Sequence, residues 1–188
     1  EQKKLRDLIS FLISLANDLG RGVDLHIDET NVSPGRGLSE LLHILDQMKV
    51  DIPITCSHLS SMGLMRRKPL KSLADRLAKH EVNVIALPLT NFWLLSKNIH
   101  STPSKRPIAP IKQLQQAGVV VAIGGDNVQD PWYPAGNFDP LALMATSIPM
   151  THVVPWTRLG LSAFTTAASR VMGLKCNGCL EVGASADF

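Results

Sequence analysis

The sequence has few of the features that assign a protein to a specialised class. Its three cysteines in 188 residues are too few, and odd in number, for a disulfide framework. No apolar run approaches the roughly 18 residues that a membrane-spanning helix needs. The net charge of +3 is too small and too scattered to indicate a nucleic-acid partner. We therefore expect a protein of a reducing, cytoplasmic compartment that binds neither membrane nor nucleic acid.

Several recognisable motifs are also missing. The sequence contains no G-x-G-x-x-G, no P-loop and no G-x-S-x-G. Cys176 and Cys179 form a single C-x-x-C in a turn-like stretch, which without a second pair indicates free thiols, and Cys56 lies within an expected strand and reads as core. The chain opens at Glu1 with neither an initiator methionine nor a signal-peptide pattern, so we expect it to be a piece of something longer.

What the sequence does contain is a regular alternation of helical and strand patterns. Apolar residues recur at helical spacing over residues 4–19, and a strictly alternating strand pattern follows at 22–28. Helical segments separate this strand from three more and also end the pattern, with strands expected at 53–58, 82–87 and 119–123 and a last helical stretch at 156–173. Strands that alternate with helices predict parallel βαβ units, and therefore the α/β class.

Two architectures fit this order, a doubly wound open sheet and a (β/α)8 TIM barrel. The open sheet lacks the expected Gly-rich turn after an early strand. The barrel is favoured because polar residues follow three of the four strands, at 26–29, at His58, and at Asp126 with Asn127. A closed barrel takes on the order of 200–250 residues, and four strands cannot close it. We therefore predict a partial (β/α)8 barrel, about half of one.

The polar residues at these strand ends are the candidates for chemistry. His26 lies on the polar face of the first strand, and the chain must bend near Asp28 for Glu29 to reach the same site. His58 ends the second strand and Asp126 follows the fourth. Each histidine alone fits a core position, but imidazole and carboxylate groups together suit zinc, iron(II) or manganese. The combination favours metal-assisted hydrolysis.

The segment after the fourth strand adds two expectations. Gly124 and Gly125 indicate that the backbone bends sharply there or approaches a neighbour closely. Trp132 lies in the rigid aromatic loop 130–134. This loop either packs on itself or covers a flat aromatic substrate, on which the indole would stack.

These motifs resemble the cytosine deaminase-like branch of the amidohydrolase superfamily. The similarity lies in its fifth-strand motif, its sixth-strand end, and its eighth strand with the following loop, at residues 23–30, 55–58 and 125–134. Residues 180–188 resemble the segment where such chains leave the barrel. The resemblance implies that residues 1–178 form the C-terminal half of the barrel, strands five to eight, and that 179–188 begin a small β-sandwich.

The resemblance also implies a role for each candidate residue. His26 and Asp126 would be ligands of one divalent metal ion, zinc or iron, with manganese possible. Asp126 would also accept a proton from the attacking water. Glu29 would protonate a ring nitrogen, and His58 would hydrogen-bond the attacking hydroxide or the developing oxyanion. The reaction would be hydrolytic deamination at an amidine carbon of a nitrogen heterocycle, with ammonia released.

Two departures from the family pattern leave alternatives open. The H-x-H pair of strand one is not in the sequence. The N-terminal half would then be on another chain or in a part of the protein outside this sequence, or the protein would be a true fragment. This chain alone would bind metal poorly and not stay monomeric. Asn127 stands where many cytosine deaminases have aspartate, while Trp132 would still wall the pocket. The substrate could then be another cyclic amidine or amide, triazine- or creatinine-like. A non-catalytic half-barrel that needs a partner is the third reading.

Overall fold

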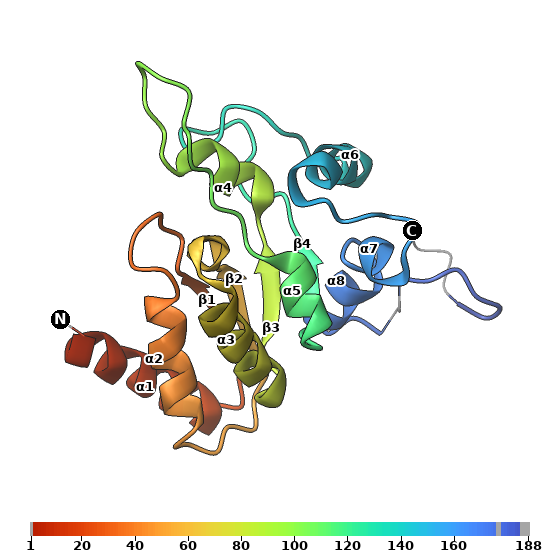
Figure 1. Cartoon of the computed structure of the whole chain (residues 1–188). Coiled ribbons are helices and arrows are strands. Elements are labelled where there is room, and N and C mark those ends of the chain that lie inside the picture. The colour runs from red at the N-terminus through yellow and green to blue at the C-terminus, as the bar shows by residue number, and fades with distance from the viewer. Residues whose placement is uncertain (1, 176–177, 185–188) are drawn as a thin grey trace.

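A computed structural model describes residues 2–175 and 178–184, and its centre is a four-stranded parallel sheet (Figure 1). The strands lie in the order β1-β2-β3-β4 and span Val23–Ile27, Ile54–His58, Asn83–Ala86 and Val121–Ile123. Each strand therefore pairs with its neighbour in sequence, and every connection is a crossover. The order does not reverse, as it would at the switch point of a doubly wound sheet. The predicted α/β class and parallel sheet are confirmed.

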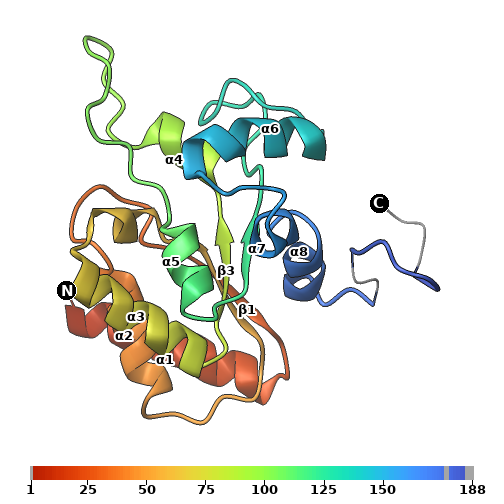
Figure 2. The ribbon, with the colours of Figure 1, turned by 45° about the vertical axis from the view of Figure 1, so that its right-hand side comes forward.

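Helices precede the sheet, occupy its crossovers and make up the C-terminal part of the chain. They are α1 (Gln2–Asp18), α2 (Arg36–Leu45), the 3-10 helix η1 (Ser60–Leu64), α3 (Arg67–Lys79), α4 (Pro88–Leu94), α5 (Ile111–Gln116), α6 (Pro140–Thr151), α7 (Arg158–Ser162) and α8 (Thr166–Val171). In both views α4 and α6 lie together beyond the carboxyl end of β3 (Figure 1, Figure 2), and they contact each other. They cover the end of the sheet where the candidate residues collect.

The outer, helix-covered face of the sheet forms the hydrophobic core. The register aligns one apolar row across all four strands, made of Leu25, Cys56, Val84 and Val121. Fully buried leucines of the helices close over this row, among them Leu38, Leu41, Leu42, Leu77 and Leu114. These residues belong to one continuous cluster that also includes α1. Cys56 is fully buried within it, as predicted for a core cysteine.

The inner face of the sheet is polar along its first two strands. The register aligns Asp24 with Thr55, and His26 with Ser57. Ser57 donates a hydrogen bond from Oγ to Asp24 Oδ1 at 2.9 Å. Exposure alternates strictly along β1, with Asp24 and His26 exposed and their apolar neighbours half-buried. The alternation predicted from the sequence is confirmed, and the inner face is exposed along β1 but buried along β2.

The structure differs from the sequence prediction in helices α4 and α6, in the final helical stretch and in strand β4. Helices α4 and α6 were not expected, because α4 is short and α6 is apolar on all sides and contains Pro149. Asp139 caps α6 by accepting hydrogen bonds from the amides of Leu141 and Ala142. The final helical stretch is divided into the short helices α7 and α8. Strand β4 has three residues and starts at Val121, two positions later than predicted.

Helix α1 is apolar on two sides. Ile9, Ile13 and Ala16 are buried against the core. A second stripe faces away from it, made of Leu8 (58% exposed), Phe11 (68%), Leu12 (41%), Leu15 (44%) and Leu19 (65%). The next strand position beside β1 is also unoccupied by any described strand. This corner of the molecule therefore carries an uncovered apolar surface and an open sheet edge.

The C-terminal end contains the predicted free thiols of Cys176 and Cys179 and the predicted start of a β-sandwich. Cys176 lies outside the described residues, as do residues 185–188, and Cys179 is half-buried with a free thiol. Burial raises the pKa of the Cys179 thiol, and Glu181 raises it further. Residues 178–184 contain no strand. Across the part of the chain that the structure describes, no helix combines the length and apolarity required to cross a bilayer.

Candidate active site

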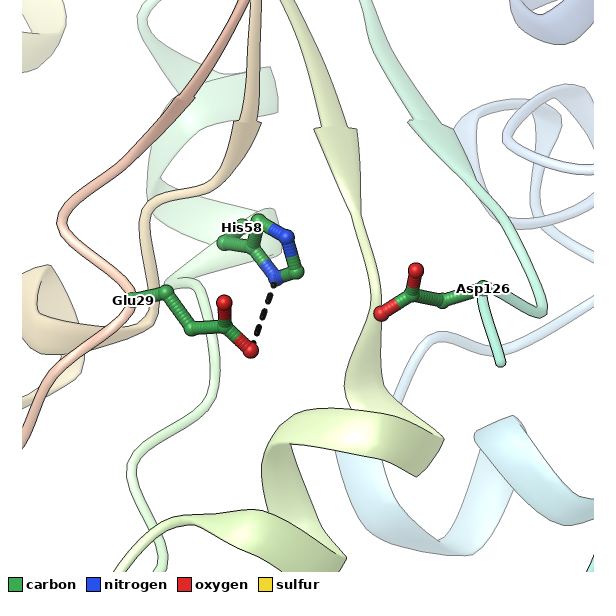
Figure 3. Close-up of side chains that lie close together, drawn as sticks. All are labelled: Glu29, His58 and Asp126. Carbon is green, nitrogen blue, oxygen red and sulfur yellow. Dashed lines mark ion pairs between the residues drawn. The ribbon is translucent and has the colours of Figure 1, made fainter. Parts of the chain in front are cut away.

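Glu29, His58 and Asp126 meet at the carboxyl edge of the sheet (Figure 3). They come from the ends of β1, β2 and β4, which are up to 97 positions apart in the chain (126 − 29). Each offers one ligand atom, and these atoms all lie within 4.8 Å of one another. His58 Nδ1 is 3.4 Å from Glu29 Oε1. The three residues predicted as catalytic thus share one site.

A left-handed backbone ends three of the strands. Asp28, His58 and Asp126 have φ angles of +56°, +74° and +61°. Aspartate and histidine tolerate this region better than most side chains. The bend at Asp28 releases Glu29 from the alternation of β1, as the sequence predicted. His58 pairs with Ile27 in the strand register, so regular alternation would point its side chain to the helix-covered outer face. The left-handed backbone at His58 ends this alternation.

The glycines before Asp126 have a different role from the bend itself. Gly124 has an ordinary φ, but a Cβ added to it would lie 3.0 Å from Leu87 Cδ2. Gly125 has no neighbour within 4 Å of such a Cβ. The close approach predicted for this pair is therefore present at Gly124, whereas the sharp turn falls one residue after the pair, on Asp126.

His26 contacts this cluster through His58. Its Nδ1 lies 2.9 Å from His58 Nε2, and the two rings are edge to face with centroids 4.9 Å apart. His26 is exposed on the inner face, whereas His58 is 2% exposed. The structure brings together the four residues predicted as ligands or catalysts, with His26 adjacent to the three-residue cluster and not a member of it.

The environment of His58 favours the neutral ring. Burial lowers its pKa below the ordinary value of 6.5, although the Glu29 and Asp126 carboxylates act in the opposite direction. A neutral imidazole has one N–H donor and one acceptor nitrogen, so its hydrogen-bond partners decide where the proton sits. Each ring nitrogen of His58 has a partner: His26 lies at Nε2, and the side-chain amide of Asn91 lies at Nδ1.

Asn91 is a site residue that the sequence analysis did not identify. It lies in the first half of α4 and is fully buried. Its Nδ2 is 3.1 Å from Glu29 Oε1 and 3.0 Å from His58 Nδ1. The strand before it ends at Ala86, so the polar residue comes five positions later, after a helix start at Pro88. The available signal was a pair of polar residues, Thr90 and Asn91, just after the helix start at Pro88.

Asp28 has a structural role beside the site. Its two carboxylate oxygens accept hydrogen bonds from the backbone amides of Gly37 and Leu38, both at 2.9 Å. Burial raises the pKa of Asp28, and these two backbone bonds oppose the rise. The carboxylate satisfies free amides at the start of α2. Asp28 therefore anchors the loop that carries Glu29.

The loop after β4 is built around Asp130. Its carboxylate accepts hydrogen bonds from the Asn127 side-chain amide and from the backbone amides of Trp132 and Tyr133. Burial alone would raise its pKa, but the bonds from Tyr133, Asn127 and Trp132 lower it. Asp130 thereby fixes which way the amide of Asn127 points, with nitrogen toward the carboxylate.

A cavity of about 580 Å³ lies beside Asp126, between this loop, α4 and α6. Asp126 and Asn127 line it, together with Leu89 and Tyr133. Trp132 does not line the cavity and is 59% exposed. Of the two residues predicted to contact substrate, Asn127 therefore borders the described cavity, and Trp132 projects from the neighbouring loop.

The donor set of the cluster suits a transition metal. One imidazole and two carboxylates offer nitrogen and oxygen ligands of the kind that zinc, iron(II) and manganese accept. The imidazole of His26 stands next to them as a further nitrogen donor. Because the ligand atoms lie within 4.8 Å of one another, the cluster is a candidate site for one ion.

Comparison with known proteins bears on this arrangement. The chain is 27% identical over 177 residues to a pterin deaminase of Rhizobium rhizogenes, covering 94% of this chain and 40% of the relative. The crystal structure of a 5-methylcytosine deaminase from Klebsiella pneumoniae liganded with 5-fluorocytosine superposes with a TM-score of 0.80 and 28% identity. It covers 96% of this chain, which spans 44% of that structure.

A third relative shares a shorter stretch. An N-isopropylammelide isopropyl amidohydrolase of Pseudomonas is 33% identical over 90 residues, which is 47% of this chain and 22% of the relative. The chain thus spans less than half the length of these relatives. The resemblance to the cytosine deaminase-like branch is confirmed. The family model for the amidohydrolases matches residues 2–188, and the chain belongs to the amidohydrolase family.

Proposed function

We propose that this chain is the C-terminal half of a (β/α)8 barrel, strands five to eight, in an enzyme that hydrolytically deaminates a nitrogen heterocycle. The observation that carries the proposal is the convergence of Glu29, His58 and Asp126 at the carboxyl edge of a parallel sheet. Active sites of such barrels lie at this edge. The deaminase relatives, whose structure superposes over nearly the whole chain, support the same reaction class.

Each side chain takes one part in the proposed reaction. Deamination by water forms a carbon–oxygen bond and breaks the carbon–nitrogen bond to the departing ammonia. Asp126 accepts a proton from the attacking water. Glu29 gives a proton to the ring nitrogen and helps to protonate the leaving amine. His58 donates a hydrogen bond to the oxygen that attacks, and this bond strengthens as negative charge develops there.

A divalent metal ion completes this proposal. His26 and Asp126 would hold it from this chain, with His58 and Glu29 beside it. When bound, such an ion lowers the pKa of a coordinated water to roughly 7, so that hydroxide is available at neutral pH. Zinc, iron(II) and manganese all suit these ligands.

We propose that the other half of the barrel covers the open corner of this one. The apolar stripe of α1 and the free edge of β1 adjoin each other at the start of the sheet. In a barrel this is where strand four and its helix would pack. The relatives are more than twice as long as this chain, which is enough for four further strands. In the same proposal, residues 179–188 begin the β-sandwich and the enzyme is cytoplasmic.

The substrate class is a flat ring that contains an amidine or amide carbon. The relatives act on pterin, 5-methylcytosine and N-isopropylammelide, according to their names. Asn127 borders the cavity and offers an uncharged amide where an aspartate would offer a carboxylate. This difference favours, as a second candidate, an amidohydrolase for a triazine- or creatinine-like ring over a cytosine deaminase.

The test uses the protein with both halves of its barrel present. Purified protein is assayed for ammonia release from cytosine, 5-methylcytosine, pterin and a triazine, and its metal content is measured. We expect one ring to be turned over, with activity lost on chelation and restored by zinc, iron(II) or manganese. A completed barrel that holds no metal and turns over none of these rings contradicts the proposal, and would favour the non-catalytic half-barrel.

A further inference from the structure

All four strands send a polar side chain to the carboxyl edge of the sheet, and three of these have proposed roles. Glu29, His58 and Asp126 follow β1, β2 and β4. The side chain that follows β3 is Asn91, which is fully buried and touches two of the other three. A buried amide in contact with two site residues, and with no role in the proposed proton transfers, calls for an explanation.

The hydrogen bonds of Asn91 fix its orientation. A carboxylate oxygen accepts hydrogen bonds, so the amide atom 3.1 Å from Glu29 Oε1 is the nitrogen. The same nitrogen lies 3.0 Å from His58 Nδ1. An NH2 group has two hydrogens, and the two contacts use one each. The carbonyl oxygen of Asn91 is buried and has no partner among the described residues, so nothing there favours the opposite orientation.

This orientation determines the state of the neighbouring ring. Two N–H groups cannot face each other at 3.0 Å, and Glu29 Oε1, at 3.4 Å from Nδ1, is farther than an ordinary N–H···O bond. These contacts make His58 Nδ1 the acceptor and leave the ring proton on Nε2. Nε2 faces the inner side of the sheet, 2.9 Å from His26 Nδ1. With its proton on Nε2, His58 donates to His26 Nδ1 in this structure, and the proposed hydrogen bond to the attacking oxygen would use the same proton.

We infer that Asn91 is a positioning residue that sets the tautomer of His58 and holds the Glu29 carboxylate beside it. One amide therefore aligns a hydrogen-bond donor and a proton carrier from two different strands. The meaning of this alignment for catalysis rests on the proposed function. The tautomer itself can be measured without any turnover, so the two ideas can fail separately.

The decisive variant is Asn91→Asp, which has nearly the same shape but replaces the donor by an acceptor. A carboxylate at this position accepts a hydrogen bond from His58 Nδ1, so the ring proton moves to Nδ1. Asn91→Leu removes the donor without adding an acceptor. Thr90→Val is the matched control, because Thr90 is buried in the same helical turn and its hydroxyl has no partner in the described part of the chain.

The measurement is a long-range proton–nitrogen NMR correlation on histidine-labelled protein with both barrel halves, with His58 assigned through His58→Gln. We expect the Nε2–H form in the parent and in Thr90→Val, and the Nδ1–H form in Asn91→Asp. Circular dichroism checks that each variant is folded. An Nδ1–H form in the parent, or an Nε2–H form that persists in folded Asn91→Asp, overturns the inference.

Kinetics on a substrate identified as above add a second readout. We expect Asn91→Asp to lower kcat by about 100-fold, which is within the range for misplaced acid–base groups, and to change KM by less than about threefold. The kcat of Asn91→Leu should lie between those of Asn91→Asp and the parent. A proportional loss in Thr90→Val would indicate a packing role for this helical turn and contradict the inference. If the tautomers behave as expected but no ring is turned over, the proposed function fails and the positioning contact stands.

Discussion

The two faces of the sheet differ in composition and in burial. The outer face is an apolar row sealed by helices, with Cys56, Val84 and the leucines over them almost entirely buried. The inner face exposes Asp24 and His26 and leads to the cluster at the carboxyl edge. Burial of apolar groups stabilises the fold, whereas polar groups on an open face contribute little to it. The difference separates residues that hold the chain together from those proposed to carry the chemistry, and substitutions on each face test the division.

The largest effect is expected from Asp126→Asn on the inner face. It removes the proposed proton acceptor while keeping a side chain that tolerates the left-handed backbone at this position. We expect kcat of the completed barrel to fall by about 1,000-fold, with the melting temperature unchanged. Turnover and thermal unfolding are measured on the same sample. A variant that keeps a third or more of the activity would remove Asp126 from the mechanism.

The next effect is expected from Leu77→Ala on the outer face. Leu77 is fully buried between α3 and the sheet, and its truncation leaves a cavity. We expect a loss of about 2–5 kcal/mol in the free energy of unfolding, measured in urea, with kcat per folded molecule unchanged. The matched control is Leu8→Ala, the same change at a residue that is 58% exposed, for which about 0.5 kcal/mol or less is expected in this chain alone. Similar losses at both positions would contradict the division between covered and open surfaces.

The exposed stripe of α1 is the exception to this division, because it is apolar and uncovered. We expect the isolated chain to self-associate through it, and Phe11→Glu with Leu15→Glu to weaken that association by at least about tenfold. Sedimentation velocity over a range of concentrations measures the effect. A parent chain that sediments as a sharp monomer and melts cooperatively would show that this surface needs no cover.

The smallest effect is expected at a polar contact between α2 and α3. Asp46 accepts hydrogen bonds from His80 at 2.7 Å and from Arg76 at 2.6 Å. These bonds, that of His80 first, hold the pKa of Asp46 well below its ordinary value of 3.8. A carboxyl whose pKa is lowered on folding stabilises the protein above its unfolded pKa, and this contribution is lost as the pH falls below it.

The change Asp46→Asn should therefore lower the melting temperature slightly at pH 7 and less and less below about pH 4. Asp75→Asn is the matched control, since Asp75 pairs with Lys71 on the surface of a single helix. We expect it to change the melting temperature by less at every pH. A difference between Asp46→Asn and the parent that stays constant from pH 7 to pH 3 would contradict the assignment.

The elements that could be predicted from the sequence are those with a regular hydrophobic period. The period of two in β1 and the helical spacing of α1 fixed their elements to within a few residues, because burial of one face enforces these periods. Helix α6 has apolar residues on every side, so it showed no such period. The polar residues at strand ends were found because parallel strands bring their carboxyl ends to one edge.

Periodicity could not predict the contact between Asn91 and His58, because it depends on the tertiary fold. Asn91 lies 33 positions after His58 and reaches it because α4 lies beyond the carboxyl end of β3 (Figure 1). Nothing in its local pattern shows that contact. Asn127 and Trp132 were placed in the pocket by resemblance, and the orientation of Asn127 is set by Asp130, which the sequence analysis did not single out.

The left-handed residues at the strand ends limit how this site can change. At positions 28, 58 and 126 the backbone accepts aspartate, asparagine, histidine or glycine and resists β-branched side chains, whatever the chemistry requires. In saturation mutagenesis of the gene, the residues tolerated at His58 and Asp126 should therefore be restricted twice, once by the activity and once by the left-handed backbone. Position 28 should be restricted by the left-handed backbone and by the demand for a carboxylate cap. Drift toward a new substrate would then proceed through the neighbours of these positions, such as Asn127, sooner than through the positions themselves.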